Sequence, residues 1–206
     1  MQISHFTARF SRRAITIAAT AGAAAMLGVT ATVAVASGAR APAHLFTFRL
    51  VPSAGISSCL PHARGTVTII THHENDTMIV RVAGLPKHSE FDLFVIQVPN
   101  KPFGVSWYQT DVDTGRDGTG SAIVRGIFDS ETFSVSPGGT TTFGPTHQFH
   151  LGLWFNSPSQ PFRLGCEPGA TAPIVTPFNG AQHAGIQVLN TGEFPDNAGP
   201  LRHVHR

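Results

Sequence analysis

Apolar and polar residues alternate along several short segments of the chain after residue 43. In "HLFTFRL", Phe46, Phe48 and Leu50 share one face, while Thr47 and Arg49 share the other. Alternation with a period of two is typical of a β-strand that buries one face. The pattern predicts strands within residues 44–50, 64–70, 76–82, 120–128, 131–135 and 184–189.

One segment breaks the alternation. "FDLFVIQV", residues 91–98, is apolar on both faces, which predicts a central strand covered on each side. The chain's 21 glycines and 15 prolines punctuate these segments. Together they predict an all-β fold, an antiparallel β-sandwich of the Ig-like or Greek-key type. We expect a single domain over residues 37–206, with long loops near 136–147 and 156–183.

The first 36 residues are predicted to be an export signal peptide. "MQISHFTARFSRR" carries three arginines and no acid, an Ala-rich run follows, and "AVA" at 34–36 supplies a cleavage pattern. "SRRAIT" resembles the twin-arginine signal, so either that route or the Sec route fits a bacterial protein. An uncleaved anchor over residues 14–36 is the alternative, although Ala, Gly and Thr partition weakly into lipid. We expect a secreted, extracellular protein with no membrane contact after cleavage.

Signal removal changes the charge of the chain. The full sequence has 14 basic and 12 acidic residues, and loss of Arg9, Arg12 and Arg13 leaves 11 and 12, a net charge of −1. No basic run remains. This balance argues against nucleic acid and against an anionic membrane surface as partners.

The chain has two cysteines, Cys59 and Cys166. Outside the cytoplasm they are expected to form one disulfide. A disulfide that closes a loop of that length would stabilise the fold by about 4 kcal/mol, because it restricts the unfolded chain. The alternative is a pair of free thiols, one of them catalytic.

Several motifs occur along the chain in a fixed order: the "GLP" turn, "FDLFVIQ", "SWYQ", a "DG" hairpin, "HLGLWFNSP" and "AGIQVLN". In this combination the chain resembles an uncharacterised family of secreted bacterial β-sandwich proteins. The resemblance covers nearly all of the mature chain. It implies a secreted β-sandwich, and it brings no activity, cofactor or catalytic residue with it.

Several histidines are candidate metal ligands. In "PTHQFHLGLWF", His147 and His150 are three apart and face opposite ways in a strand. The stretch invites comparison with the "FHxH" strand of copper/zinc superoxide dismutase, but Gly152 stands where the second histidine would be. The adjacent His72 and His73 diverge as well if their strand continues through them. A site assembled from His150 with His183 or His62 stays open, yet we predict no metal and no cofactor.

Acidic residues suggest two further sites. In "TDVDTGRDGTG", the acids at 111, 113 and 117 break the calcium-loop pattern, and Asp117-Gly118 predicts a hairpin turn. A glycosidase pair of Asp92 with Glu131 is conceivable. Because Asp92 begins an apolar strand, a structural ion pair with Arg81 or Arg125 is the favoured interpretation.

No nucleophile elbow, zinc-protease or P-loop motif is present, which favours a protein that is not an enzyme. The aromatic segment "PFGVSWYQT" and the strand at 150–155 are the candidate binding surface, through Trp107, Tyr108, His150 and Trp154. The competing interpretation is that these aromatics close the core. We predict a secreted, non-catalytic protein that binds a glycan or a protein partner. The alternative is a secreted hydrolase or metalloprotein whose histidines and carboxylates meet only in the fold.

Overall fold

The computed structural model describes residues 44–128, 134–135, 142–143, 149–177 and 183–204. By contacts the chain divides into Met1–Ala39 and Arg40–Arg206, and every described residue belongs to the second unit. The predicted signal peptide, His147, Glu131 and most of the loop near 136–147 lie outside the described residues. Export therefore stays a prediction. No described helix is long and apolar enough to cross a membrane.

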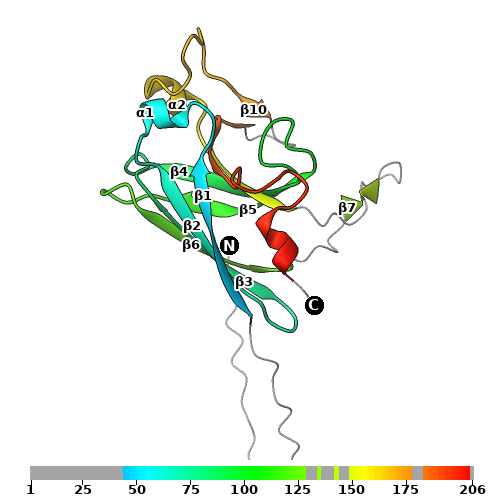
Figure 1. Ribbon diagram of the computed structural model, residues 1–206. Helices are drawn as coiled ribbons and strands as arrows, with labels where there is room; N and C mark the ends of the chain where they lie inside the picture. Colours follow the sequence, from blue (N-terminus) through cyan, green and yellow to red (C-terminus); the bar gives the residue numbers. More distant parts are fainter. Residues whose placement is uncertain (1–43, 129–133, 136–141, 144–148, 178–182, 205–206) are drawn as a thin grey trace, which may run out of the picture. The chain divides into compact units, whose positions relative to one another are not determined.

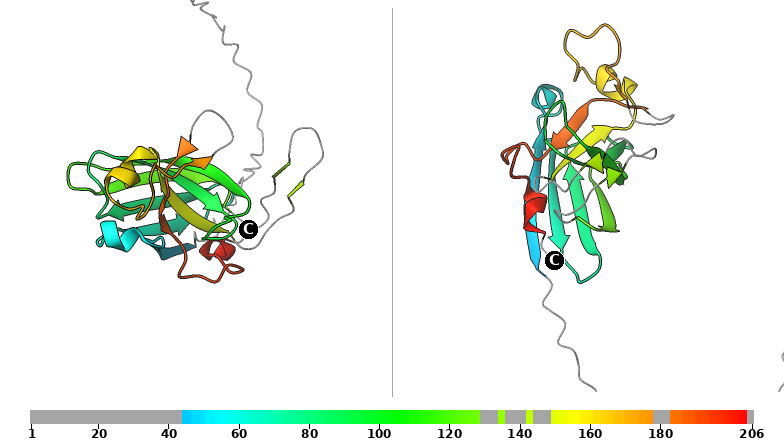
Figure 2. Two further views of the ribbon diagram at one scale, coloured as in Figure 1. Left: turned by 90° about the horizontal axis from the view of Figure 1, so that it is seen from above. Right: turned by 90° about the vertical axis from the view of Figure 1, so that its right-hand side faces the viewer.

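Eight antiparallel strands form one large sheet in the order β5-β4-β9-β12-β1-β2-β3-β6 (Figure 1). Its two outermost strands follow one another in the chain, and a bridge between Thr114 and Gly120 brings them together. The sheet is therefore nearly barrel-like, and Figure 2 shows it curling around its interior. The strands are β1 (Leu45–Pro52), β2 (Arg64–Ile70), β3 (Asp76–Ala83), β4 (Glu90–Ile96), β5 (Ser106–Asp113), β6 (Gly120–Gly126), β9 (His150–Phe155) and β12 (Gln187–Asn190).

The all-β antiparallel class is confirmed, whereas the Ig-like sandwich is not. A sandwich has two separate sheets, but β1 joins both halves of this one. Its residues 45–50 pair with β2, and Val51 and Pro52 pair with β12. The remaining elements are α1 (Ile56–Cys59), α2 (Ser159–Arg163), η1 (Pro200–His203) and two short hairpins, β7 (Ser134–Val135) with β8 (Thr142–Phe143) and β10 (Thr176–Pro177) with β11 (His183–Ala184).

The alternating residues meet in one interior core. In β2 and β3, for example, Val67 and Val80 are cross-strand neighbours and both are buried. The predicted turn at Asp117-Gly118 is confirmed, since Gly118 adopts φ 73° and the Asp117 side chain accepts from the backbone N–H of Thr119. Local pattern and turn chemistry therefore agree along these strands.

The strand β4 is buried on both faces, as its sequence predicts. Phe91, Leu93 and Val95 belong to the interior core, while Phe94 and Ile96 lie on the outer face. On that outer face they form a second cluster with Trp154 and Ala184, and Phe103 packs against it. We call this group the outer cluster.

The predicted disulfide is present between Cys59 and Cys166, with the Cα atoms 5.1 Å apart. It tethers the end of α1 to the segment after α2, and the two helices lie at one end of the sheet (Figure 1). The long connection predicted near 156–183 is thus partly helical and covalently anchored.

Candidate functional site

Four carboxylates face one another on the outer side of β4 and β5. In the strand register Glu90 lies opposite Asp113 and Asp92 lies opposite Asp111. Val112, between the two aspartates of β5, points into the core, so the acids share the other face. We call Glu90, Asp92, Asp111 and Asp113 the carboxylate array. Like charges placed directly opposite one another in a sheet are destabilising, so the array has a cost that calls for a physical reason.

Asp92 is the unusual member of the array. It is 2 % exposed, and no hydrogen-bond partner in the described residues reaches either of its carboxylate oxygens. Burial, and then the negative charges of Asp111 and Glu90, raise the pKa of Asp92 from 3.8 to about 7. Asp111, directly opposite in the neighbouring strand, thus contributes to the shift of Asp92. At neutral pH the Asp92 carboxyl group is therefore protonated in part of the molecules.

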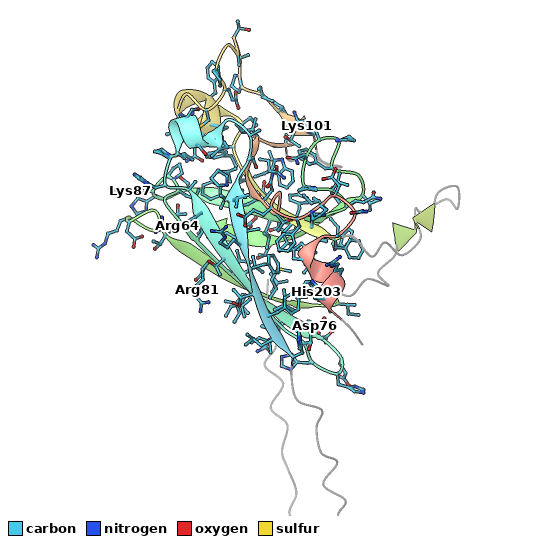
Figure 3. The ribbon with its side chains drawn as sticks, in the orientation of Figure 1. Arg64, Asp76, Arg81, Lys87, Lys101 and His203 are labelled. Carbon is cyan, nitrogen blue, oxygen red and sulfur yellow. A yellow bond between two sulfur atoms is a disulfide. The ribbon has the colours of Figure 1, made fainter. Side chains whose placement is uncertain are left out.

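The predicted ion pair of Asp92 with an arginine is wrong. Arg81 lies opposite Thr66 and Ser121, and Arg125 lies opposite Thr77, all on the other half of the sheet. Figure 3 shows Arg81 on that half. The sequence does not show which strands pair, and the pairing separates both arginines from Asp92.

A β-bulge places Tyr108 beside the array. The register shifts after the pair of Leu93 with Thr110, so that Phe94 lies opposite Tyr108 and Gln109 is skipped. Tyr108 and Asp111 thereby share a face although they are three residues apart. The hydroxyl of Tyr108 donates to Oδ1 of Asp111 at 2.7 Å, and the residue stays 51 % exposed. Partial burial and the hydrogen bond to Asp111 raise the pKa of Tyr108, so its hydroxyl remains a donor.

Trp154 borders the array from β9 and is only 3 % exposed. It lies opposite Asp92 in register, and its ring packs edge-on against Phe94 at 5.4 Å and Phe103 at 5.0 Å. A Cβ on Gly152 would lie 2.4 Å from Cζ3 of Trp154, so the ring occupies the space that this glycine leaves. Its indole Nε1 has no hydrogen-bond partner among the described residues. Trp154 closes the outer cluster and is not an exposed stacking surface.

Trp107 is separated from Tyr108 by the alternation of the strand. Its ring packs edge-on against Phe149 at 4.9 Å and borders the interior core. The two adjacent aromatics that suggested one surface therefore face opposite sides of β5. Of the four predicted binding residues, Tyr108 alone is substantially exposed.

His150 is completely buried beneath the chain that follows β12. Its Nδ1 lies 2.9 Å from Oγ1 of Thr191, and its Nε2 lies 3.3 Å from the backbone oxygen of Asp196. A carbonyl only accepts, so Nε2 carries the proton. Burial lowers the pKa of His150 against the opposing effect of these hydrogen bonds, and the ring is a neutral structural group.

Within the described residues, no group of three or more His, Cys, Asp or Glu side chains is placed to hold a metal ion. At Gly152, where superoxide dismutase would have its second histidine, the Trp154 ring and the Gln187 amide take up the space.

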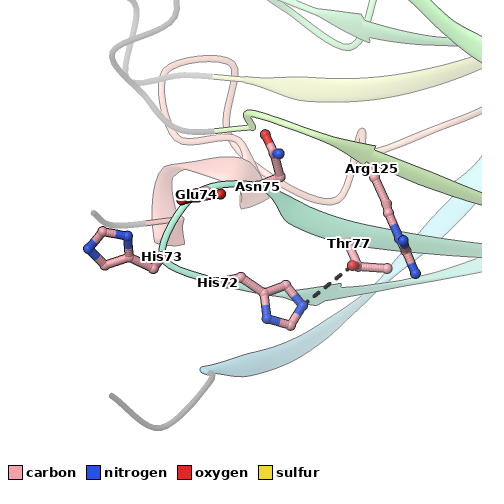
Figure 4. Close-up of a pocket in the computed structure, with 6 residues that line it drawn as sticks. All are labelled: His72, His73, Glu74, Asn75, Thr77 and Arg125. Atoms are coloured by element: carbon pink, nitrogen blue, oxygen red, sulfur yellow. Dashed lines mark hydrogen bonds between the residues drawn. The ribbon is translucent and has the colours of Figure 1, made fainter. Parts of the chain in front are cut away.

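A polar pocket of about 520 Å³ opens at the turn between β2 and β3 (Figure 4). His72 and His73 point in different directions there, and Nε2 of His72 lies 3.4 Å from Oγ1 of Thr77. The strand ends at Ile70, so both histidines belong to the turn. The pocket is lined by His72, His73, Glu74, Asn75, Thr77 and Arg125, and this mixture of charges selects no single ligand.

Sequence reasoning missed the array as a unit. "EFD" and "TDVD" each hold two acids at alternate positions, which was a visible signal. The pairing of these strands was not visible. Comparison of the chain with protein-family models, with curated proteins and with solved structures gave no match.

Proposed function

We propose that this chain is a secreted, non-catalytic bacterial protein that binds a partner molecule outside the cell through the carboxylate array and Tyr108. The observation that carries the proposal is the buried carboxylate of Asp92, which has no described hydrogen-bond partner. It lies beside Asp111, which accepts a hydrogen bond from the half-exposed Tyr108. A buried polar group without a partner costs about 1–3 kcal/mol, and such groups concentrate where a protein binds or reacts.

The disulfide supports an extracellular location. The antiparallel all-β fold agrees with the class of the secreted proteins that the motifs resemble, although its single large sheet is not a sandwich. Tyrosine combines a large rigid ring with a polar tip, which suits it to a binding surface. Here the tip is fixed by Asp111, so little side-chain entropy is lost on binding.

A hydrolase is the second candidate, because one of two adjacent carboxyl groups can act as a general acid when burial raises its pKa. Asp92 carries the shift to about 7 that a general acid needs. A general acid must reach its substrate within hydrogen-bond distance, and Asp92 is 2 % exposed. Burial of the acid favours binding over hydrolysis.

The proposal is tested with the protein purified from its secreting host and applied to glycan and peptide arrays. We expect Tyr108→Ala to weaken the strongest hit at least about tenfold, which corresponds to about 1.4 kcal/mol. Ile123→Ala, which removes an exposed side chain from β6, is the matched control and should bind as the wild type does. Equal binding by the wild type and Tyr108→Ala would refute the proposed surface.

A further inference from the structure

The carboxylate array has no countercharge of its own. No described basic side chain forms an ion pair with any of its four members, whereas Arg49 on β1 is paired with Glu193. Glu90, Asp111 and Asp113 are exposed, and the buried Asp92 lies opposite Asp111 in the strand register. Three exposed acids around a buried, unpartnered one make a surface that is complementary to positive charge.

We propose that the array binds an extended basic segment of a partner protein, whose lysine or arginine side chains at alternate positions lie against Asp111 and Asp113. This inference rests on the proposed function and names the ligand class for the same surface.

The spacing of the acids matches an extended peptide. Residues two apart in a strand are separated by about 6.6–6.8 Å, since each residue rises about 3.3–3.4 Å. Asp111 and Asp113 on β5 have this separation, and so do Glu90 and Asp92 on β4. Alternate side chains of an extended ligand repeat at the same distance. Two basic side chains of such a ligand can therefore lie against the two carboxylates of a strand without distortion of either backbone.

Tyr108 supplies the apolar part of the site. A lysine or arginine stem packs on an aromatic ring while its charged head reaches a neighbouring carboxylate. The ring of Tyr108 is exposed and its hydroxyl is anchored on Asp111, so ring and carboxylate are held in a fixed relation.

Asp92 makes the binding dependent on pH. The titratable groups that act on it are Asp111 of β5, Glu90 on its own strand and Tyr108, while Asp113 lies opposite Glu90 and the neighbour of Asp92 on β9 is Trp154, which does not titrate. A bound cation favours the ionised form of Asp92 and lowers its pKa from about 7. Binding should therefore release protons near neutral pH and strengthen as the pH rises from 6 to 8.

The probe is the synthetic peptide Lys-Thr-Lys-Thr-Lys, titrated calorimetrically into the protein from its secreting host at pH 6 and pH 8. We expect binding that weakens about tenfold between low and high salt, because exposed charges are screened. The double variant Asp111→Asn with Asp113→Asn should bind at least about tenfold more weakly. An asparagine oxygen still accepts from Tyr108, so that anchor is kept.

The matched control removes the same number of charges elsewhere, by Glu193→Gln with Asp196→Asn. Its affinity should stay within about twofold of the wild type, since both residues lie outside the array. A thermal melt verifies that both double variants are folded.

Two outcomes overturn the inference: no binding of the lysine peptide, or equal weakening in both double variants, which would mean nonspecific charge attraction. The glycan and peptide arrays distinguish a failure of this inference from a failure of the proposed function. A neutral glycan or peptide that needs Tyr108 but tolerates Asp111→Asn with Asp113→Asn would uphold the binding surface and refute the basic ligand.

Discussion

Two buried aspartates show how the two halves of the sheet differ. Asp76 begins β3 in the half formed by β1, β2, β3 and β6, and it accepts from the backbone N–H groups of His72 and Phe128. Asp92 lies in β4 of the other half, equally hidden, and no described donor reaches it. The first carboxylate anchors a turn and a strand end. The burial of the second carboxylate lowers the stability of the fold, and no described contact compensates for that loss.

The surfaces of the halves differ in the same way. Along β2 and β3 the outer face carries exposed residues such as Arg64 and Arg81 (Figure 3), with the core on the inner face alone. On β4 and β9 the outer face is also packed, because the outer cluster covers it. A polar group on a doubly buried strand cannot turn to solvent, which is why the perturbed carboxyl occurs there.

The largest expected difference between the halves comes from removing an aromatic side chain. Trp154→Ala should lower the free energy of unfolding by about 3–5 kcal/mol, since it leaves a cavity in the outer cluster. Ile123→Ala, on the outer face of β6, should change it by no more than about 0.5 kcal/mol. Urea unfolding measures both. Similar small losses would show that the outer cluster contributes little to stability.

Next in size is the effect of a methyl group at a glycine. Gly152→Ala would bring its Cβ to 2.4 Å from the Trp154 ring, so we expect a loss of about 1–3 kcal/mol. The control is Gly126→Ala in β6, where the nearest atom, on the Phe128 ring, is 3.3 Å away. A smaller loss is expected there. If both variants unfold at the same urea concentration, the tight packing of Trp154 over Gly152 is refuted.

The two aspartates should respond to amide substitution with opposite signs at pH 8. Asp76→Asn should destabilise the fold by about 1–3 kcal/mol, because it weakens charge-assisted acceptance from two backbone donors. Asp92→Asn should stabilise it by about 1–2 kcal/mol, since it removes repulsion with Asp111 and Glu90. Chemical denaturation of both variants decides this. Destabilisation by Asp92→Asn would mean that its charge has a partner.

The raised pKa of Asp92 should also make the stability of the whole fold depend on pH. The pKa of Asp92 is about 7 in the folded chain and near 3.8 when unfolded, so between these values the folded state holds the proton more tightly. This contribution to stability is complete at low pH and is lost as the pH rises through 7. Unfolding measured from pH 5 to 8 should show the decline in the wild type and less of it in Asp92→Asn. Equal slopes would contradict the shift.

The local sequence pattern predicted much of the fold. Alternation predicted the strands of the first half, and the doubly apolar "FDLFVIQ" predicted the two-sided burial of β4. The cysteine count predicted the disulfide. The Ig-like sandwich was not confirmed, because a period-two pattern states which face is buried and leaves open which strands pair. That pairing makes β1 a bridge between the two halves of one sheet.

Of the candidate site, the sequence by itself determined the residue types and the face of each strand on which they lie. Alternation in "TDVD" puts its two acids on one face of a strand, as the structure has them. Only the tertiary structure decided that Asp92 meets Asp111 and Trp154, that a bulge turns Tyr108 toward them, and that the chain after β12 buries His150. Cross-strand neighbours depend on register between segments far apart in the chain, and no local pattern encodes register.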